Sequence, residues 1–209
     1  QQWRGSGHVA GAPGASTSLV TEDVEQLKAL VGRAPWFMAA LRAGRELGLA
    51  SWCIGAGALR NLGWDSLHAH AQPTALADLD FAYFCAEDLD PARDATLQFR
   101  LQRSCPALPW EVTNQAGVHL WFEAHFGHAV APLRSLETAV ASWPEPATAV
   151  GIWLDGDDAL QVIAPLGLAD LLGMRIRRNP LGVSVETYRE RCASKRYMER
   201  WPRVVVEPA

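Results

Sequence analysis

Two aspartates lie two residues apart inside an otherwise apolar run, and this pattern constrains the fold more than any other feature. The run covers residues 77–84, and its remaining side chains are those of a buried strand. Side chains alternate between the two faces of a strand, so Asp78 and Asp80 point the same way. Two carboxylates on one apolar strand are costly to bury unless they meet a cation. The pattern therefore predicts a sheet with a metal site on one face, and the alternative is a solvent-facing edge strand.

Helices and strands alternate along the rest of the chain. Helical spacing of apolar residues or capping signals predict helices over residues 21–31, 35–47, 58–67, 92–102, 135–143, 167–174 and 184–199. Apolar or alternating runs predict strands over residues 49–54, 77–84, 110–115, 147–154 and 159–163. The last two strands flank a hairpin turn signal at residues 155–158. Strands separated by helices indicate an α+β (mixed α/β) domain with a helical C-terminal part.

The two ends of the chain differ in composition. The first residues are rich in Gly, Ala and Ser and lack the apolar core of a signal peptide. We therefore expect a flexible tail over residues 1–20. A chain of 209 residues can hold one large domain or two small ones. We expect a single domain over residues 21–209, with a core at about 50–165 and the helical part at about 166–209.

Charge and cysteine usage exclude several classes of function. A net charge of −4 gives no bulk attraction to nucleic acid or to an anionic membrane. Five Arg and Lys residues between positions 189 and 200 are interpreted as a solvated helix face. The four cysteines are scattered without a CxxC pair, which disfavours a zinc site and indicates a reduced, cytoplasmic protein. No apolar run reaches the roughly 18 residues of a membrane span.

A glycine turn, Gly55-Ala56-Gly57, leads from a strand into a helix upstream of the acidic strand. Free N–H groups at a helix N-terminus bind phosphate, and glycines allow the phosphate to approach closely. A tight strand-to-helix turn would use the same residues, so the two interpretations are compatible. Arg60, one helical turn further on, could reach a phosphate or pair with Asp65, and both alternatives stay open.

Glu111 lies in the next expected strand and is the third candidate acid. Three carboxylates can hold two divalent cations roughly 3.5–4 Å apart. The alternative is a surface acid, since a slip of one residue in strand register would reverse its face. In this order, a phosphate-binding turn, a paired acid and a third acid fit phosphoryl or nucleotidyl transfer. The histidines at positions 119, 125 and 128 are expected to be ordinary hydrogen-bonded side chains.

Five segments form a specific combination: residues 55–61, 78–80, 110–116 with His119, 143–150, and 164–171. Together they resemble a bacterial nucleotidyltransferase-like family of the polymerase-beta-type nucleotidyltransferase superfamily. The resemblance extends from about residue 52 to residue 201 and implies a small mixed β-sheet core flanked by helices. It also implies that an NMP is moved from an NTP to an acceptor hydroxyl with release of pyrophosphate.

The resemblance assigns roles to individual residues. Asp78 and Asp80 would bind Mg²⁺, or alternatively Mn²⁺, at the NTP phosphates. Glu111 would complete the acidic triad as a third metal ligand and help to deprotonate the acceptor. The nucleotide would be held by Gly55, Ala56, Gly57, Arg60 and Asn61. The wider superfamily usually has Gly-Ser or Gly-Gly in the turn, so with Gly-Ala-Gly the contact with phosphate would rest on backbone N–H groups.

The acceptor and one competing function stay open. A small molecule, a protein side chain or an RNA end could each supply the hydroxyl, whereas the weakly acidic chain disfavours a long nucleic acid. The alternative function is a non-catalytic nucleotide- or metal-binding regulatory module. Retention of all three acids argues against a site that has lost its activity.

Overall fold

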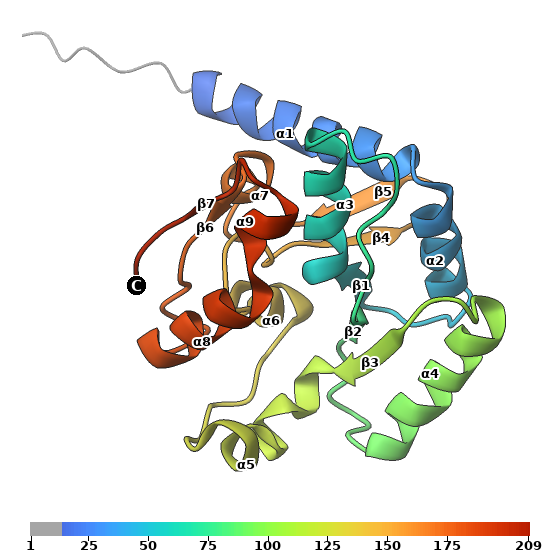
Figure 1. Ribbon diagram of the computed structural model, residues 1–209. Coiled ribbons are helices and arrows are strands. Elements are labelled where there is room, and N and C mark those ends of the chain that lie inside the picture. The colour runs from blue at the N-terminus through green and yellow to red at the C-terminus, as the bar shows by residue number, and fades with distance from the viewer. Residues whose placement is uncertain (1–13) are drawn as a thin grey trace, which may run out of the picture.

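The computed structural model describes residues 14–209 and is built around one five-stranded mixed sheet (Figure 1). The strands, in the spatial order β3-β2-β1-β4-β5, are β1 (Trp52–Gly55), β2 (Leu79–Tyr83), β3 (Trp110–Asn114), β4 (Gly151–Leu154) and β5 (Leu160–Ile163). β2 and β3 are parallel, and the other neighbouring pairs are antiparallel. The α+β class predicted from the sequence is confirmed.

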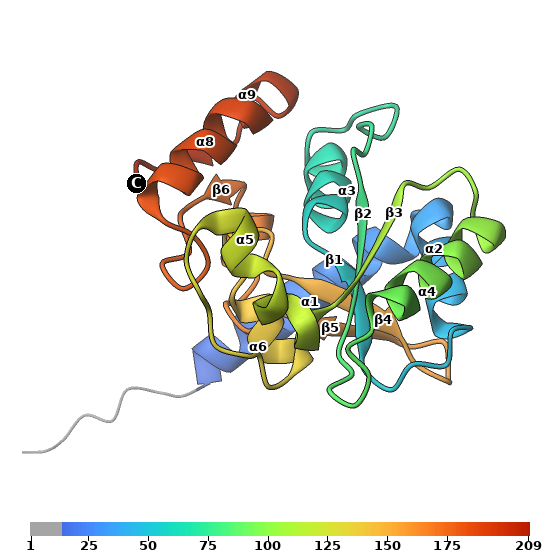
Figure 2. The same cartoon turned by 90° about the horizontal axis from the view of Figure 1, so that it is seen from below.

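Helices surround this sheet and form most of the C-terminal part (Figures 1 and 2). Before β4 they are α1 (Gly14–Gly32), α2 (Pro35–Arg45), α3 (Gly57–Leu67), α4 (Pro91–Ser104), the 3-10 helix η1 (Gln115–Leu120), α5 (Phe122–Phe126) and α6 (Leu136–Ala141). After β5 they are α7 (Ala169–Leu172), α8 (Val185–Lys195) and α9 (Tyr197–Arg200). A short parallel pair, β6 (Arg175–Ile176) and β7 (Val205–Val206), completes the C-terminal part.

Capping residues define where two of these helices begin. Asp90 accepts a hydrogen bond from the Ala92 N–H, and Pro91 occupies the first helical position of α4, as the sequence predicts. Ser135 and Thr138 form a reciprocal capping box at the start of α6. These local signals explain why the beginnings of both helices can be read from the sequence.

The two faces of the sheet are covered differently, and this difference leaves the acids accessible. On one face, Trp52 and Phe81 stack and lie so close to α2 that a Cβ on Gly44 would come within 2.8 Å of both rings. This face is part of the main hydrophobic cluster. On the other face, Cys53 and Ala82 belong to a smaller cluster that includes residues of α6. Asp80 shares this second face, because it lies two residues from Ala82.

The boundaries of several elements differ from those predicted. α1 begins at Gly14, so residues 14–20 are helical although the sequence predicted a tail; residues 1–13 of that tail lie outside the described residues. The first four residues of the predicted strand 147–154 instead lie in a turn and the segment after it, where the Thr148 and Ala149 N–H groups donate to the Glu145 carbonyl. The predicted helix 184–199 is interrupted at Arg196, whose φ of +46° ends α8. η1, α5, β6 and β7 were not predicted.

The C-terminal helices share the main hydrophobic cluster with the sheet. This cluster includes Leu27 in α1 and Val204 near the C-terminus. Within it, Trp64 of α3 makes edge-on contacts with the Tyr197 and Trp201 rings, at centroid distances of 6.1 and 5.3 Å. The assignment of residues 21–209 to a single domain stays a prediction. Across residues 14–209, we find no helix that combines the length and the apolar character needed to cross a bilayer.

Candidate active site

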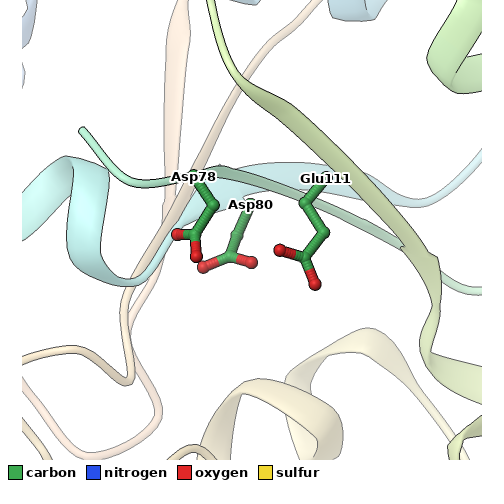
Figure 3. A group of neighbouring side chains, drawn as sticks. All are labelled: Asp78, Asp80 and Glu111. Carbon is green, nitrogen blue, oxygen red and sulfur yellow. The ribbon is translucent and has the colours of Figure 1, made fainter.

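Three carboxylates meet at the side of β2 and β3 (Figure 3). In the parallel register, Asp80 lies directly beside Glu111, and Asp78 immediately precedes β2. One carboxylate oxygen from each residue lies within 4.8 Å of the other two. Figure 3 shows all three side chains projecting to the same side of the two strands. The structure thus brings together the three acids that the sequence predicts as one group.

The charge of this acidic group is only partly compensated. Burial raises the pKa of the Asp80 carboxyl to about 7, and the negative charges of Asp78 and Glu111 act in the same direction. The positive charges of Lys195 and Arg191 oppose this rise in pKa. Converging carboxylate oxygens are the ligands that Mg²⁺ and Mn²⁺ prefer. The donor set and its uncompensated charge therefore fit a divalent cation.

The glycine turn brings the N-terminus of α3 to the same place. Gly55 is required by packing, because a Cβ there would lie 2.3 Å from the Val150 carbonyl oxygen of the adjacent chain segment. Ala56 adopts a φ of +54°, a region that non-glycine residues rarely enter and that is enriched at functional sites. No side chain among the described residues caps α3, so its first N–H groups are available to a ligand.

A cavity of about 260 Å³ lies between the acids, the turn and α8, and we call it the charged cavity. Its lining includes the three acids, Ala56 and Gly57 of the turn, and three cationic side chains: Arg60, Arg191 and Lys195. Gly55 and Asn61 line no part of it. The cavity therefore has an acidic wall on the sheet and a basic wall formed by α3 and α8.

Arg60 is buried among aromatic rings. Its guanidinium carbon lies 5.3 Å from the ring centroid of Tyr197, 5.6 Å from that of Trp201 and 5.9 Å from that of Trp64. Nε and Nη2 both donate to Asn61 Oδ1, so Asn61 orients Arg60 instead of lining the cavity. Burial lowers the pKa of Arg60, which is the effect of removing a charge from water.

Asp65 is not the partner of Arg60, so one of the two alternatives that the sequence left open is wrong, and contact of Arg60 with a phosphate stays a prediction. It accepts hydrogen bonds from the Trp201 indole and from the backbone N–H and hydroxyl of Thr74, and its carboxylate also lies 3.0 Å from His70 Nδ1. These contacts anchor the loop that leads into Asp78. Asp65 thus supports the acidic wall from a distance, and Arg60 is left facing the cavity.

A buried ion pair holds the basic wall in place. Glu145 is fully buried, and its two carboxylate oxygens lie 2.8 and 3.1 Å from Arg191 Nε and Nη2. The Thr148 hydroxyl donates to the same carboxylate at 2.9 Å. The ion pair fastens α8 to the turn that follows α6. It positions Arg191 against the cavity.

Lys195 lies one helical turn after Arg191 and faces the same cavity. Burial lowers the pKa of Lys195, and the positive charges of Arg60 and Arg191 lower it further. An anionic ligand would relieve this crowding of positive charge. The interpretation of the whole 189–200 cluster as a solvated face is therefore wrong for these two residues, and their spacing of four was the available signal. Arg189, Arg196 and Arg200 are exposed as expected.

Asn114 serves the fold near the site. Its Oδ1 accepts hydrogen bonds from the Ala116 and Cys85 N–H groups, and its Nδ2 donates to the Cys85 and Asp88 carbonyls. It therefore caps η1 and ties β3 to the loop after β2. The aromatic segment of η1 and α5 starts from this cap.

Two of three comparisons with known proteins found a match. The sequence model of a family described as nucleotidyltransferase matches residues 42–206. A solved structure described as an NMR structure that reveals a CCA-adding enzyme head domain is similar, with a TM-score of 0.75 and 26% identity over 88% of this chain and 96% of that one. A tRNA-processing enzyme in an apo form aligns with a TM-score of 0.45 and 17% identity, over 80% of this chain and 44% of that one. No curated protein matches the chain.

Proposed function

The chain belongs to the nucleotidyltransferase family, and on that premise we propose that it moves an NMP from an NTP to an acceptor hydroxyl in a metal-dependent reaction. The observation that carries the proposal is the charged cavity, where three carboxylates face three cationic side chains beside the N-terminus of α3. A carboxylate cluster alone would suit many cations. Together with the basic wall, it suits a cation that is bound together with a polyphosphate.

In this proposal the acidic wall holds the metal. Asp78, Asp80 and Glu111 would bind Mg²⁺, with Mn²⁺ as the alternative. When bound, the metal would neutralise charge on the triphosphate and favour deprotonation of the acceptor hydroxyl. Glu111 is the most exposed of the three acids, so its carboxylate is the one that an acceptor can approach.

The basic wall binds the triphosphate. The free N–H groups at the start of α3 face the same cavity as Arg60, Arg191 and Lys195. Arg60 and Arg191 are held by the Asn61 and Glu145 side chains, so they can meet the phosphates with little loss of side-chain entropy. Ala56 has no hydroxyl, so the turn would contribute through backbone N–H groups and through its close approach.

The proposed transfer is a single displacement at the α-phosphorus. The acceptor oxygen forms a bond to the α-phosphorus, and the bond from that phosphorus to the oxygen bridging to the β-phosphate breaks. The electron pair of that bond leaves with pyrophosphate, whose charge the basic wall stabilises. The acceptor proton passes to the Glu111 carboxylate.

The proposal also covers the acceptor and the cellular location, which membership of the family leaves open. The acceptor is a small molecule, a protein side chain or an RNA end, and the similarity to a CCA-adding enzyme head domain keeps RNA among them. A long nucleic acid is disfavoured by the net charge of −4. We place the reaction in the cytoplasm, consistent with free cysteines at positions 53, 85, 105 and 192.

A transfer assay tests the proposal. The protein is incubated with each of four α-³²P-labelled NTPs and a desalted cell extract, with Mg²⁺, with Mn²⁺ or with EDTA. We expect label to appear in an acceptor only when metal is present. In parallel, NTP with Mg²⁺ should raise the melting temperature, because a ligand at 100 times its Kd stabilises a protein by about 2.7 kcal/mol.

The competing function is a regulatory module that binds nucleotide without turnover. It predicts the same thermal shift but no labelled acceptor and no pyrophosphate. If no NTP shifts the melting temperature with either metal, the nucleotide site itself is contradicted.

A further inference from the structure

A second cavity, of about 270 Å³, opens from the acidic wall, and we call it the aromatic cavity. Six residues line both this cavity and the charged cavity: Asp80, Glu111, Thr113, Gln115, Trp143 and Pro144. Apolar and aromatic side chains from η1 to α6 and the segment after it form much of its wall: Val118, Trp121, Phe122, Phe126, Leu133 and Trp143. The two cavities therefore adjoin along β2, β3 and the segment at Trp143, and they differ in chemistry beyond these shared residues.

The lining of the aromatic cavity contains no lysine or arginine, as judged for residues 14–209. Apart from the Asp80 and Glu111 carboxylates, its polar side chains carry hydroxyls, one amide and the His128 imidazole. Phosphate oxygens bind to basic side chains and to N-termini of helices. The N-terminus of α8 borders this cavity at Ser184 and Thr187, but there the Ser184 hydroxyl already accepts a hydrogen bond from the Thr187 N–H, and no lysine or arginine stands beside it in the described lining. Its chemistry suits an uncharged body with an apolar or aromatic surface.

The position of Glu111 distinguishes the ligand of this cavity from the nucleotide. Asp78, Gly57 and Lys195 line the charged cavity and are absent from the lining of the aromatic cavity, within the described chain. Glu111, the proposed proton acceptor, lies on both. A molecule bound among the aromatic rings would thus present its hydroxyl to Glu111 from the side of η1 and α5.

His119 adds a polar group without a partner. A third cavity, of about 230 Å³, adjoins the aromatic one and shares Val118, Phe122 and His128 with it. His119 lines this third cavity, and its Nδ1 is buried without a hydrogen-bond partner among the described residues. A buried polar atom in this state is uncommon in a folded protein, and a polar group of a ligand would satisfy it.

We propose that the acceptor is a compact, non-anionic alcohol with an aromatic or alicyclic body, bound in the aromatic cavity with its hydroxyl at Glu111. This inference rests on the proposed nucleotidyl transfer. It also separates the chain from the RNA acceptor suggested by the similarity to a CCA-adding enzyme head domain. An RNA end would bring phosphates to a wall that has no cation to neutralise them.

The test measures binding in the aromatic cavity directly, without requiring turnover. Saturation-transfer-difference NMR is recorded on the full chain with four probes: 2-phenylethanol, 4-hydroxyphenylethanol, cyclohexylmethanol, and a short RNA oligonucleotide with a free 3′ hydroxyl. Each is measured with Mg²⁺ alone and again with Mg²⁺ and a non-hydrolysable ATP analogue. The thermal shift caused by the ATP analogue is recorded on the same samples.

A matched pair of substitutions identifies the cavity. Phe126 lines it and is 50% exposed, whereas Phe99 on α4 is 59% exposed and lies outside it. Phe126→Ala should weaken binding of the aromatic alcohol by roughly tenfold, because the ring no longer shields the body of the ligand from water. Phe99→Ala should leave it unchanged. Leu133→Trp, which enlarges a side chain of the lining, is a second variant that should also weaken binding.

The outcomes separate the inference from the function on which it rests. Alcohol binding that is weakened in Phe126→Ala and Leu133→Trp, kept in Phe99→Ala, and undisturbed by the ATP analogue supports the proposal. Displacement of the alcohol by the analogue would assign the cavity to the nucleobase and overturn it. So would binding of the RNA oligonucleotide that Phe126→Ala and Leu133→Trp weaken, or an absence of variant-sensitive alcohol binding. A missing thermal shift with the analogue contradicts the nucleotide site instead.

Discussion

The acidic wall and the basic wall of the charged cavity are built in different ways. The acids lie on or directly before two neighbouring strands, so backbone pairing alone places Asp80 beside Glu111. The cations come from α3 and α8, which are far apart in the sequence. Arg191 of α8 pairs with the buried Glu145 after α6, and Arg60 of α3 lies among three aromatic rings, two of them from the C-terminal part. The acidic wall is thus a property of one sheet, whereas the basic wall depends on packing across the molecule.

The largest expected effect comes from breaking the acidic wall. Asp80→Asn should lower the rate of nucleotidyl transfer on the order of 10³-fold, because it removes a central charge of the proposed metal site. The fold should be intact or more stable, since the substitution relieves repulsion among the acids. The measurement is turnover of an α-labelled NTP, with circular dichroism as a check on folding.

Asp157→Asn is the matched control for this variant. Asp157 lies in the exposed β4–β5 turn, where its backbone N–H contributes to the turn, so the asparagine variant should keep the wild-type rate. A metal-dependent rate that survives in Asp80→Asn would contradict the assigned role of the acidic wall.

The acidic wall should also make the metal-free protein sensitive to pH. The folded pKa of Asp80, about 7, exceeds the value of an ordinary aspartate, so its contribution to stability is present at low pH and is lost as the pH rises through 7. With EDTA present, we expect the free energy of unfolding to fall by about 2 kcal/mol between roughly pH 5 and pH 8. Urea unfolding at a series of pH values measures this fall in the free energy of unfolding.

Two further measurements sharpen this prediction. In Asp80→Asn the fall should be largely absent, and in the wild type Mg²⁺ should restore stability most at the higher pH. Identical pH profiles for the two proteins would show that burial and the neighbouring acids do not raise the pKa of Asp80 in the folded protein.

The smallest expected effect comes from the basic wall. Lys195→Met should weaken binding of an NTP analogue with Mg²⁺ by roughly tenfold, the effect of removing one charge-assisted hydrogen bond. Calorimetry on the full chain measures the Kd. Arg189→Met, on the exposed side of the same helix, should leave the Kd unchanged. Equal Kd values for wild type and Lys195→Met would mean that the triphosphate lies elsewhere in the cavity.

Much of the site could be predicted because it depends on local rules. The period of two along a strand places Asp78 and Asp80 on one face, and Asp90 and Ser135 mark helix starts through their caps. The sequence left the role of Arg60 undecided between contact with a phosphate and an ion pair with Asp65. Asp65 instead accepts hydrogen bonds from Thr74 and Trp201, and no local sequence pattern predicts these contacts.

The residues that sequence analysis missed depend on distant parts of the chain. Arg191 and Lys195 resemble other basic residues of an exposed helix until α8 is fastened to Glu145. The aromatic segment at η1 and α5 has no strong hydrophobic periodicity, so the sequence gives no signal for it. Only the folded structure brings it together with Trp143 to line a cavity.

The sequence by itself determined the sheet, the glycine turn and the acids, because hydrophobic alternation and turn chemistry act over a few residues. The tertiary structure alone decided which cations face those acids and which apolar side chains extend the site beyond Glu111. The physical reason is that burial and charge pairing depend on neighbours in space. The Glu145–Arg191 pair is one such contact, and it positions the basic wall opposite the acids.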